Sequence, residues 1–137
     1  NGRDTYVSPV FEITANWKPF DGTTVALTAG RRTNTSAVLA GQDFSSTRFG
    51  VSVRQRFMRR FTLGLTGGYE NSEYFSTVSN VDSVRNDNYF YVQPSVDASV
   101  TRFWSVGAYY LRRENSSALN SFSFYDNQVG FRSSLTF

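Results

Sequence analysis

The chain has 137 residues, a formal net charge of +3 at pH 7, and neither cysteine nor histidine. These absences exclude disulfides, thiolate or histidine metal sites, and catalytic groups that depend on histidine, within this segment. Hydrophobic residues make up 39%, aromatic residues 17% and charged residues 18%, a balance that favours strands over helices and predicts an all-β protein. The even composition indicates one domain over residues 1–137.

The basic residues are scattered along the chain, so no patch indicates a nucleic-acid partner. No apolar run approaches the roughly 18 residues that a spanning helix needs, and no export signal is visible after Asn1. The chain is therefore expected either to be soluble or to span a membrane as strands, with any export signal upstream.

Apolar and polar side chains alternate through seven long segments, which predicts seven strands. The segments are Tyr6–Lys18, Thr23–Thr33, Phe44–Phe57, Phe61–Phe75, Asn88–Thr101, Phe103–Arg113 and Phe124–Phe137. Such strands exceed the five or six residues usual in soluble proteins and meet the nine to eleven that cross a bilayer. We therefore expect a transmembrane antiparallel up-and-down β-barrel, with a soluble sandwich as the alternative.

The connections between these segments are alternately short and long. The short ones are Pro19–Gly22, Met58–Arg60 and Thr101–Phe103, and the long ones are Asn34–Asp43, Ser76–Asp87 and Glu114–Ser123. In an up-and-down barrel, this alternation places short periplasmic turns at one rim and extracellular loops at the other.

Aromatic residues gather at the segment ends, as in the two girdles of a membrane barrel. Those near the short turns are Trp17, Phe20, Phe57, Phe61, Phe103, Trp104 and Phe137. Those toward the long loops are Tyr6, Phe44, Tyr74, Phe75, Tyr89, Tyr110, Phe124 and Tyr125. The core of a soluble sandwich would be an alternative place for these aromatic residues.

The polar sides of the segments supply the candidate pore-lining residues. They are Glu12, Lys18, Arg32, Arg48, Arg54, Arg56, Glu70, Asp97 and Arg132. Their excess of positive charge would favour anions in a water-filled lumen. An equally favoured alternative to a water-filled lumen is that the arginines pair with the carboxylates and brace a plugged interior. No spacing brings two carboxylates together for acid/base catalysis, so no enzyme, cofactor or metal is expected.

Three further arginines, Arg31, Arg112 and Arg113, lie near the long-loop rim. Their side chains could meet lipopolysaccharide phosphates, although ordinary snorkelling beside membrane lipid is the favoured interpretation.

The C-terminal residues resemble a known sorting signal. Val129, Phe131, Leu135 and the final Phe137 place apolar side chains at alternate positions. This arrangement resembles the terminal signal read by the outer-membrane barrel assembly machinery, while Ser133 and the position of Gly130 depart from its usual form. The resemblance implies that this machinery is a partner.

Two hairpin stretches, residues 59–70 and 102–110, each begin with arginine and phenylalanine and continue as a strand rich in glycine, leucine or tyrosine. They resemble the β-barrel porin family found beside bacterial exopolysaccharide loci. The resemblance implies an outer-membrane location and a pore or an accessory role in polysaccharide export. A non-conducting anchor or assembly scaffold is the alternative, and a secreted carbohydrate-binding sandwich is a third.

The strand count predicts a larger barrel. If Phe137 ends at the periplasmic rim, seven strands place Asn1 outside the cell, whereas single-chain barrels start in the periplasm with an even count. We therefore expect an odd number of further strands from the same chain or a partner.

Overall fold

The computed structural model describes residues 9–35, 42–76 and 85–136. Its elements are β1 (Phe11–Trp17), β2 (Thr23–Thr35), β3 (Gln42–Phe57), β4 (Phe61–Ser76), β5 (Arg85–Ser99), β6 (Trp104–Ser117), the short 3-10 helix η1 (Asn120–Phe122) and β7 (Phe124–Leu135). Within these ranges, no helix is long and apolar enough to cross a membrane. The all-β prediction is confirmed.

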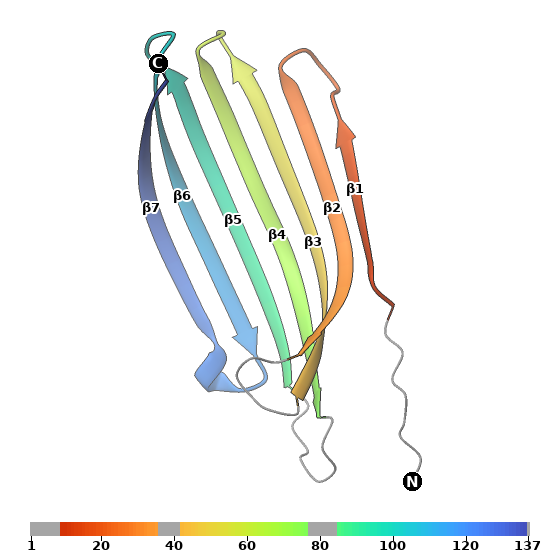
Figure 1. Cartoon of the computed structure of the whole chain (residues 1–137). Coiled ribbons are helices and arrows are strands. Elements are labelled where there is room, and N and C mark those ends of the chain that lie inside the picture. Colours follow the sequence, from red (N-terminus) through yellow and green to blue (C-terminus); the bar gives the residue numbers. More distant parts are fainter. Residues whose placement is uncertain (1–8, 36–41, 77–84, 137) are drawn as a thin grey trace.

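The seven strands form one antiparallel sheet in which every strand pairs with its neighbours in sequence. Figure 1 shows the resulting meander, with the three short turns together at the top and η1 at the bottom. We call these the turn end and the loop end of the sheet. The up-and-down topology predicted from the alternating connections is therefore confirmed.

The strands extend further toward the loop end than the sequence predicts. β2 continues to Thr35, β5 begins at Arg85 and β6 continues to Ser117. The prediction that Asn34–Asp43, Ser76–Asp87 and Glu114–Ser123 are loops throughout is wrong at these points, because residues in each range pair across the sheet. Two connections of the loop end, 36–41 and 77–84, lie outside the described residues.

The sequence accounts for the two hairpin turns at which backbone conformation matters most. Gly22 adopts φ 83°, and the Thr23 amide donates to the Phe20 carbonyl at 3.0 Å, as the Asp21-Gly22 pair predicts. Between β3 and β4, Met58 and Arg59 also adopt positive φ values. This conformation lets a three-residue connection join two long strands.

Pairing register divides the strands into two faces. The apolar face carries Ile13, Leu27, Val51, Leu65 and Val96 among others, joined in rows such as Ala15, Leu27, Val51 and Gly67. No hydrophobic side chain in the described ranges is buried, and Ile13 and Phe131 are 61% and 82% exposed. Nothing in those ranges covers the apolar face, so the packed core of a soluble sandwich is not formed there.

The sheet is open along both of its edges. Within the described ranges, β1 pairs only with β2, and β7 pairs only with β6. Each edge strand therefore presents one row of backbone donors and acceptors without a neighbouring strand.

Candidate functional site: the polar face

The polar face is the concave face of the sheet. A hollow of about 870 Å³ lies at the turn end and is lined by polar-face side chains of five strands. They are Thr24, Arg54, Arg56, Thr62, Asp97 and Ser105, joined by the first turn from Lys18 to Thr23. One hollow can touch β2 through β6 only if the sheet curves around this face.

The structure places all of the sequence-predicted lining residues on this side. Lys18 lies just after β1 and lines the hollow. The others alternate with the apolar face in the pairing register: Glu12, Arg32, Arg48, Arg54, Arg56, Glu70, Asp97 and Arg132. They are not one cluster, because they run from the hollow to the loop end.

Two ion pairs reach across an intervening strand. Arg48 of β3 donates to Glu12 of β1 at 2.5 Å, and Gly30 of β2 lies between them in the register. Arg132 of β7 donates through Nε and Nη2 to the two oxygens of Asp97 in β5, at 2.7 and 2.5 Å. A Cβ at Gly30 would lie 3.6 Å from Arg48 Nε, an ordinary contact, so the first pair does not depend on the glycine.

The second pair depends on Gly107 of β6, which registers with both Asp97 and Arg132. A Cβ at Gly107 would lie 2.2 Å from Asp97 Oδ1 and 2.9 Å from Arg132 Nε. We expect Gly107→Ala to separate the pair and to lower the free energy of unfolding by at most about 1 kcal/mol, because exposed ion pairs contribute little. Urea unfolding in detergent measures the change.

Gly67→Ala is the matched control for that substitution. Gly67 lies on the apolar face, opposite Val51 and Val92. A Cβ there makes an ordinary 3.4 Å contact with the Tyr91 carbonyl. Equal stability of the two variants would contradict the role assigned to Gly107.

The turn end of the polar face holds cations without carboxylate partners. Lys18, Arg54 and Arg56 line the hollow, and none of them forms an ion pair with the residues that the structure describes. Asp21 and Asp97 also line the hollow, and Arg132 neutralises Asp97. Three cations against the one remaining carboxylate leave the hollow with a net positive charge.

The loop end of the polar face is built differently, and the sequence interpretation missed it. Arg85 donates to Asp87 through Nε at 2.9 Å and also through Nη2. Arg113 donates to Asp126 at 2.9 Å. The hydrogen bond with Asp87 raises the pKa of Arg85, and burial raises the pKa of the neighbouring Tyr74.

The apolar face carries aromatic side chains at both borders of its apolar band. Trp17, Phe57, Phe61 and Trp104 lie at the turn-end border, and Phe49, Tyr69, Phe90 and Tyr110 at the loop-end border. Tyr69 and Tyr110 donate their hydroxyl hydrogen bonds to Asn88 at 2.5 Å and Asn127 at 2.6 Å, both further toward the loop end. Such amphipathic rings suit a boundary between hydrocarbon and water.

The predicted composition of the loop-end girdle is partly wrong. Phe44, Tyr74, Tyr89 and Phe124 register with polar-face residues. They therefore cannot face lipid beside Tyr110 and Tyr125. Tyr6 and Phe137, and the side chain of Phe75, lie outside what the structure describes.

The three arginines assigned to the long-loop rim lie on different faces of the sheet. Arg113 faces the concave side and pairs with Asp126, so its predicted position beside lipid is wrong. Arg31 and Arg112 lie on the outer side above the apolar band; Arg31 donates to Ser45 at 3.1 Å and Arg112 lies 3.8 Å from Glu114.

Three residues of the predicted sorting signal lie together at one edge of the sheet. Val129, Phe131 and Leu135 point from β7 to the apolar side and are exposed; Phe137 lies outside the described residues. Across the ranges that are described, no cluster of three or more acidic side chains could hold a metal ion.

Comparison with known proteins identifies a family. The family model described as "Putative beta-barrel porin 2" matches residues 6–136. No curated protein and no solved structure matches the chain significantly. The resemblance seen in the two hairpin stretches is confirmed at the level of a β-barrel porin family.

Proposed function

Because the chain belongs to the family described as "Putative beta-barrel porin 2", we propose that its strands form part of the wall of an anion-favouring pore in the bacterial outer membrane. The pore passes small solutes along the polar face. The observation that carries this proposal is the hollow at the turn end, where Lys18, Arg54 and Arg56 meet without carboxylate partners in the described part of the chain.

The apolar face supports the membrane position of the wall. From Phe49 to Phe57, β3 keeps apolar side chains on this face except at Gln55. At ~3.3 Å per residue this stretch is about 26 Å long, and at a tilt of about 40° its height is about 20 Å, against roughly 25 Å for the apolar band of outer-membrane barrels. Lipid thus covers the side chains that the chain itself leaves exposed.

The different lengths of the connections at the two ends of the sheet support an orientation of the wall in the membrane. The turn end, with its three short connections, lies in the periplasm, and the loop end projects outside the cell. Arg31 and Arg112 then lie on the outer side above the band, at the level of lipopolysaccharide head groups. The barrel assembly machinery is the partner that inserts β7, whose Val129, Phe131 and Leu135 form an apolar row.

The open edges support the presence of further strands in the complete wall. Unpaired backbone groups are too costly in hydrocarbon for an open sheet to remain there. Strands from the same chain or from a second chain therefore pair with β1 and β7, the two edges that are unpaired within the described ranges.

Single-channel recording on the full protein in planar bilayers tests this function. We expect discrete open levels and, under a salt gradient, a reversal potential whose sign indicates anion preference. Open levels with cation preference would contradict the assigned role of the hollow.

One observation favours a second candidate, a non-conducting outer-membrane scaffold. The loop end of the polar face is covered, since Ser46 and Asp87 are 0% and 6% exposed. A scaffold would fold correctly in bilayers and remain electrically silent under the same recording conditions.

A further inference from the structure

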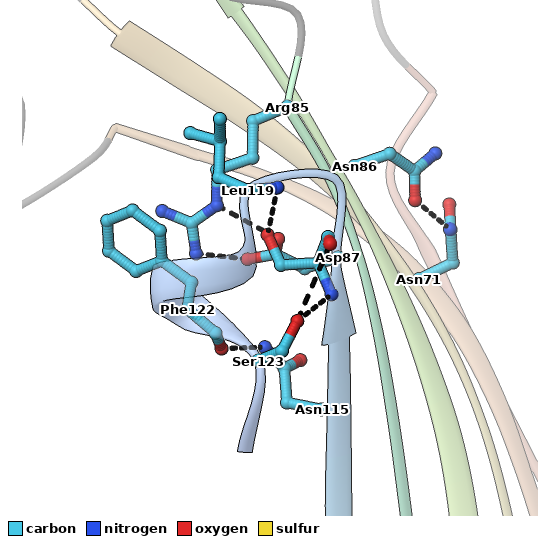
Figure 2. Close-up of polar contacts among 9 residues, drawn as sticks. Asn71, Arg85, Asn86, Asp87, Asn115, Leu119, Phe122 and Ser123 are labelled. Atoms are coloured by element: carbon cyan, nitrogen blue, oxygen red, sulfur yellow. Dashed lines mark hydrogen bonds and ion pairs between the residues drawn. The ribbon is translucent and has the colours of Figure 1, made fainter.

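The β6–β7 connection is a compact, well-tied segment. Its residues 118–123 contain η1, and the amide of Ala118 donates to the Asn86 carbonyl of β5 at 3.0 Å. Asn115 donates to the Phe122 carbonyl at 2.7 Å, and the Ser117 amide donates to Ser123 Oγ at 3.0 Å. Figure 2 shows the contacts of Asn115 and Ser123 within this segment. The connection therefore has one defined position.

Arg85 links this connection to the sheet. Its guanidinium carbon lies 3.7 Å from the ring centroid of Phe122 and 4.6 Å from that of Tyr74. Tyr74 in turn stacks on Phe44 of β3, with 5.0 Å between ring centroids. The row from Phe44 through Tyr74 and Arg85 to Phe122 thus runs from the wall onto the connection, with the planar guanidinium stacked between aromatic faces.

This row lies on the concave side. Tyr74 is paired with Phe44 of β3 and Arg85 of β5. All three residues lie on the same side of the sheet as the polar-face residues Arg48 and Asp97. Beneath them, Asp87 pairs with Arg85, and the two side chains are only 8% and 11% exposed. The β6–β7 connection therefore leans over the inner side of the wall, as the position of Phe122 beside Arg85 in Figure 2 indicates.

We propose that Arg85 is a positioning residue that latches the β6–β7 connection over the concave face at the loop end, and that the latched connection sets the size limit of the pore there. The inference rests on the proposed pore function and deepens it. The two ends of the polar face then have separate tasks: the cationic hollow selects by charge, and the latch selects by size.

Because the latch carries no net charge, its release should change the size of the pore and leave its charge selectivity unchanged. Asp87 compensates the charge of Arg85 in place, so the latch narrows the mouth without adding a local charge. Releasing the connection should therefore raise conductance and admit larger neutral solutes, while the reversal potential stays that of the native pore. A residue acting through charge alone would instead move the reversal potential.

The test combines two readouts on Arg85→Ala. A spin label at Leu119→Cys reports the mobility of the connection without any requirement for a pore, because the chain has no other cysteine and Leu119 is 49% exposed. Single-channel recording with neutral polymers of graded size reports the opening. We expect a mobile label, higher conductance and a larger polymer cut-off in the variant.

Two further variants make the result specific. Phe122→Ala removes the stacking partner and keeps the Arg85–Asp87 pair, so it should mobilise the label even if Arg85→Ala does not fold. Arg112→Ala is the matched control, because this arginine lies on the outer side near Glu114 and its loss should change neither readout.

The outcomes separate the latch from the pore. A label that stays immobile in both Arg85→Ala and Phe122→Ala would overturn the latch. A mobile label with unchanged conductance and cut-off would overturn the size limit while leaving the pore intact. A mobile label in a protein that never conducts would overturn both the size limit and the proposed function.

Discussion

Arg54→Glu combined with Arg56→Glu should convert the pore from anion to cation preference. Both side chains line the turn-end hollow and have no carboxylate partner in the described ranges. Replacing two positive charges with two negative charges there inverts the potential that a permeating ion meets in a narrow, low-dielectric passage. The sign of the reversal potential under a salt gradient measures the change.

A matched control and a salt series test whether the change in selectivity comes from the charges in the hollow. Arg59→Glu with Arg60→Glu makes the same change of charge in the neighbouring β3–β4 turn, outside the residues that line the hollow. Screening lengths fall from about 10 Å at 0.1 M to about 3 Å at 1 M salt, so the contrast between the two double variants should shrink as salt rises. Unchanged anion preference in the Arg54/Arg56 variant would refute the assignment of selectivity to the hollow.

Leu65→Arg should prevent stable insertion of the protein into bilayers. Leu65 lies on the apolar face at mid-band, paired with Val53 and Pro94, and is 48% exposed. An arginine facing lipid at that depth costs roughly 2–4 kcal/mol in outer-membrane barrels. The fraction of folded protein in vesicles, followed by urea titration, measures the loss.

Thr66→Arg provides the comparison one residue away. Thr66 lies on the polar face, opposite Ser52 and Gln93, where an arginine meets water and other polar groups. The variant should insert nearly as well as the native protein. Equal damage from the two substitutions would mean that the two faces of β4 meet the same surroundings.

Alternation predicted the strands well where one face is apolar and the other is polar. In β3, apolar side chains such as Phe49 and Val51 alternate with Arg48 and Ser52, and the strand there needs no other signal. The residues predicted as pore-lining on these stretches all lie on the polar face of the sheet.

The same signal fails beyond the apolar band because both faces of the strands become polar. β6 continues past Arg113 with Glu114 and Ser116 on one side and Asn115 and Ser117 on the other, still paired with β5. At ~3.3 Å per residue, these four residues add about 13 Å to the strand toward the loop end. Period-two amphipathicity cannot mark strands with water on both sides, which is why the loops were predicted too long.

The loop-end cluster was missed for that reason. Arg85 and Asp87 fall in a stretch interpreted as loop, and only strand pairing assigns them to the inner face. Phe122 reaches Arg85 through a turn of the chain that no periodicity describes. The role of Gly107 was equally hidden, since it depends on register across three strands.

Quenching of a fluorophore along β4 tests most directly that the apolar face touches hydrocarbon and the polar face water. The chain has no cysteine, so single cysteines can be placed in turn at each position from Phe61 to Tyr69 and labelled in the full protein in vesicles. We predict that brominated lipid quenches the label at Phe61, Leu63, Leu65 and Tyr69, and that a water-soluble quencher acts at Thr62, Gly64 and Thr66. Quenching by the aqueous agent at every position, with none by lipid, would contradict the membrane wall and everything inferred from it.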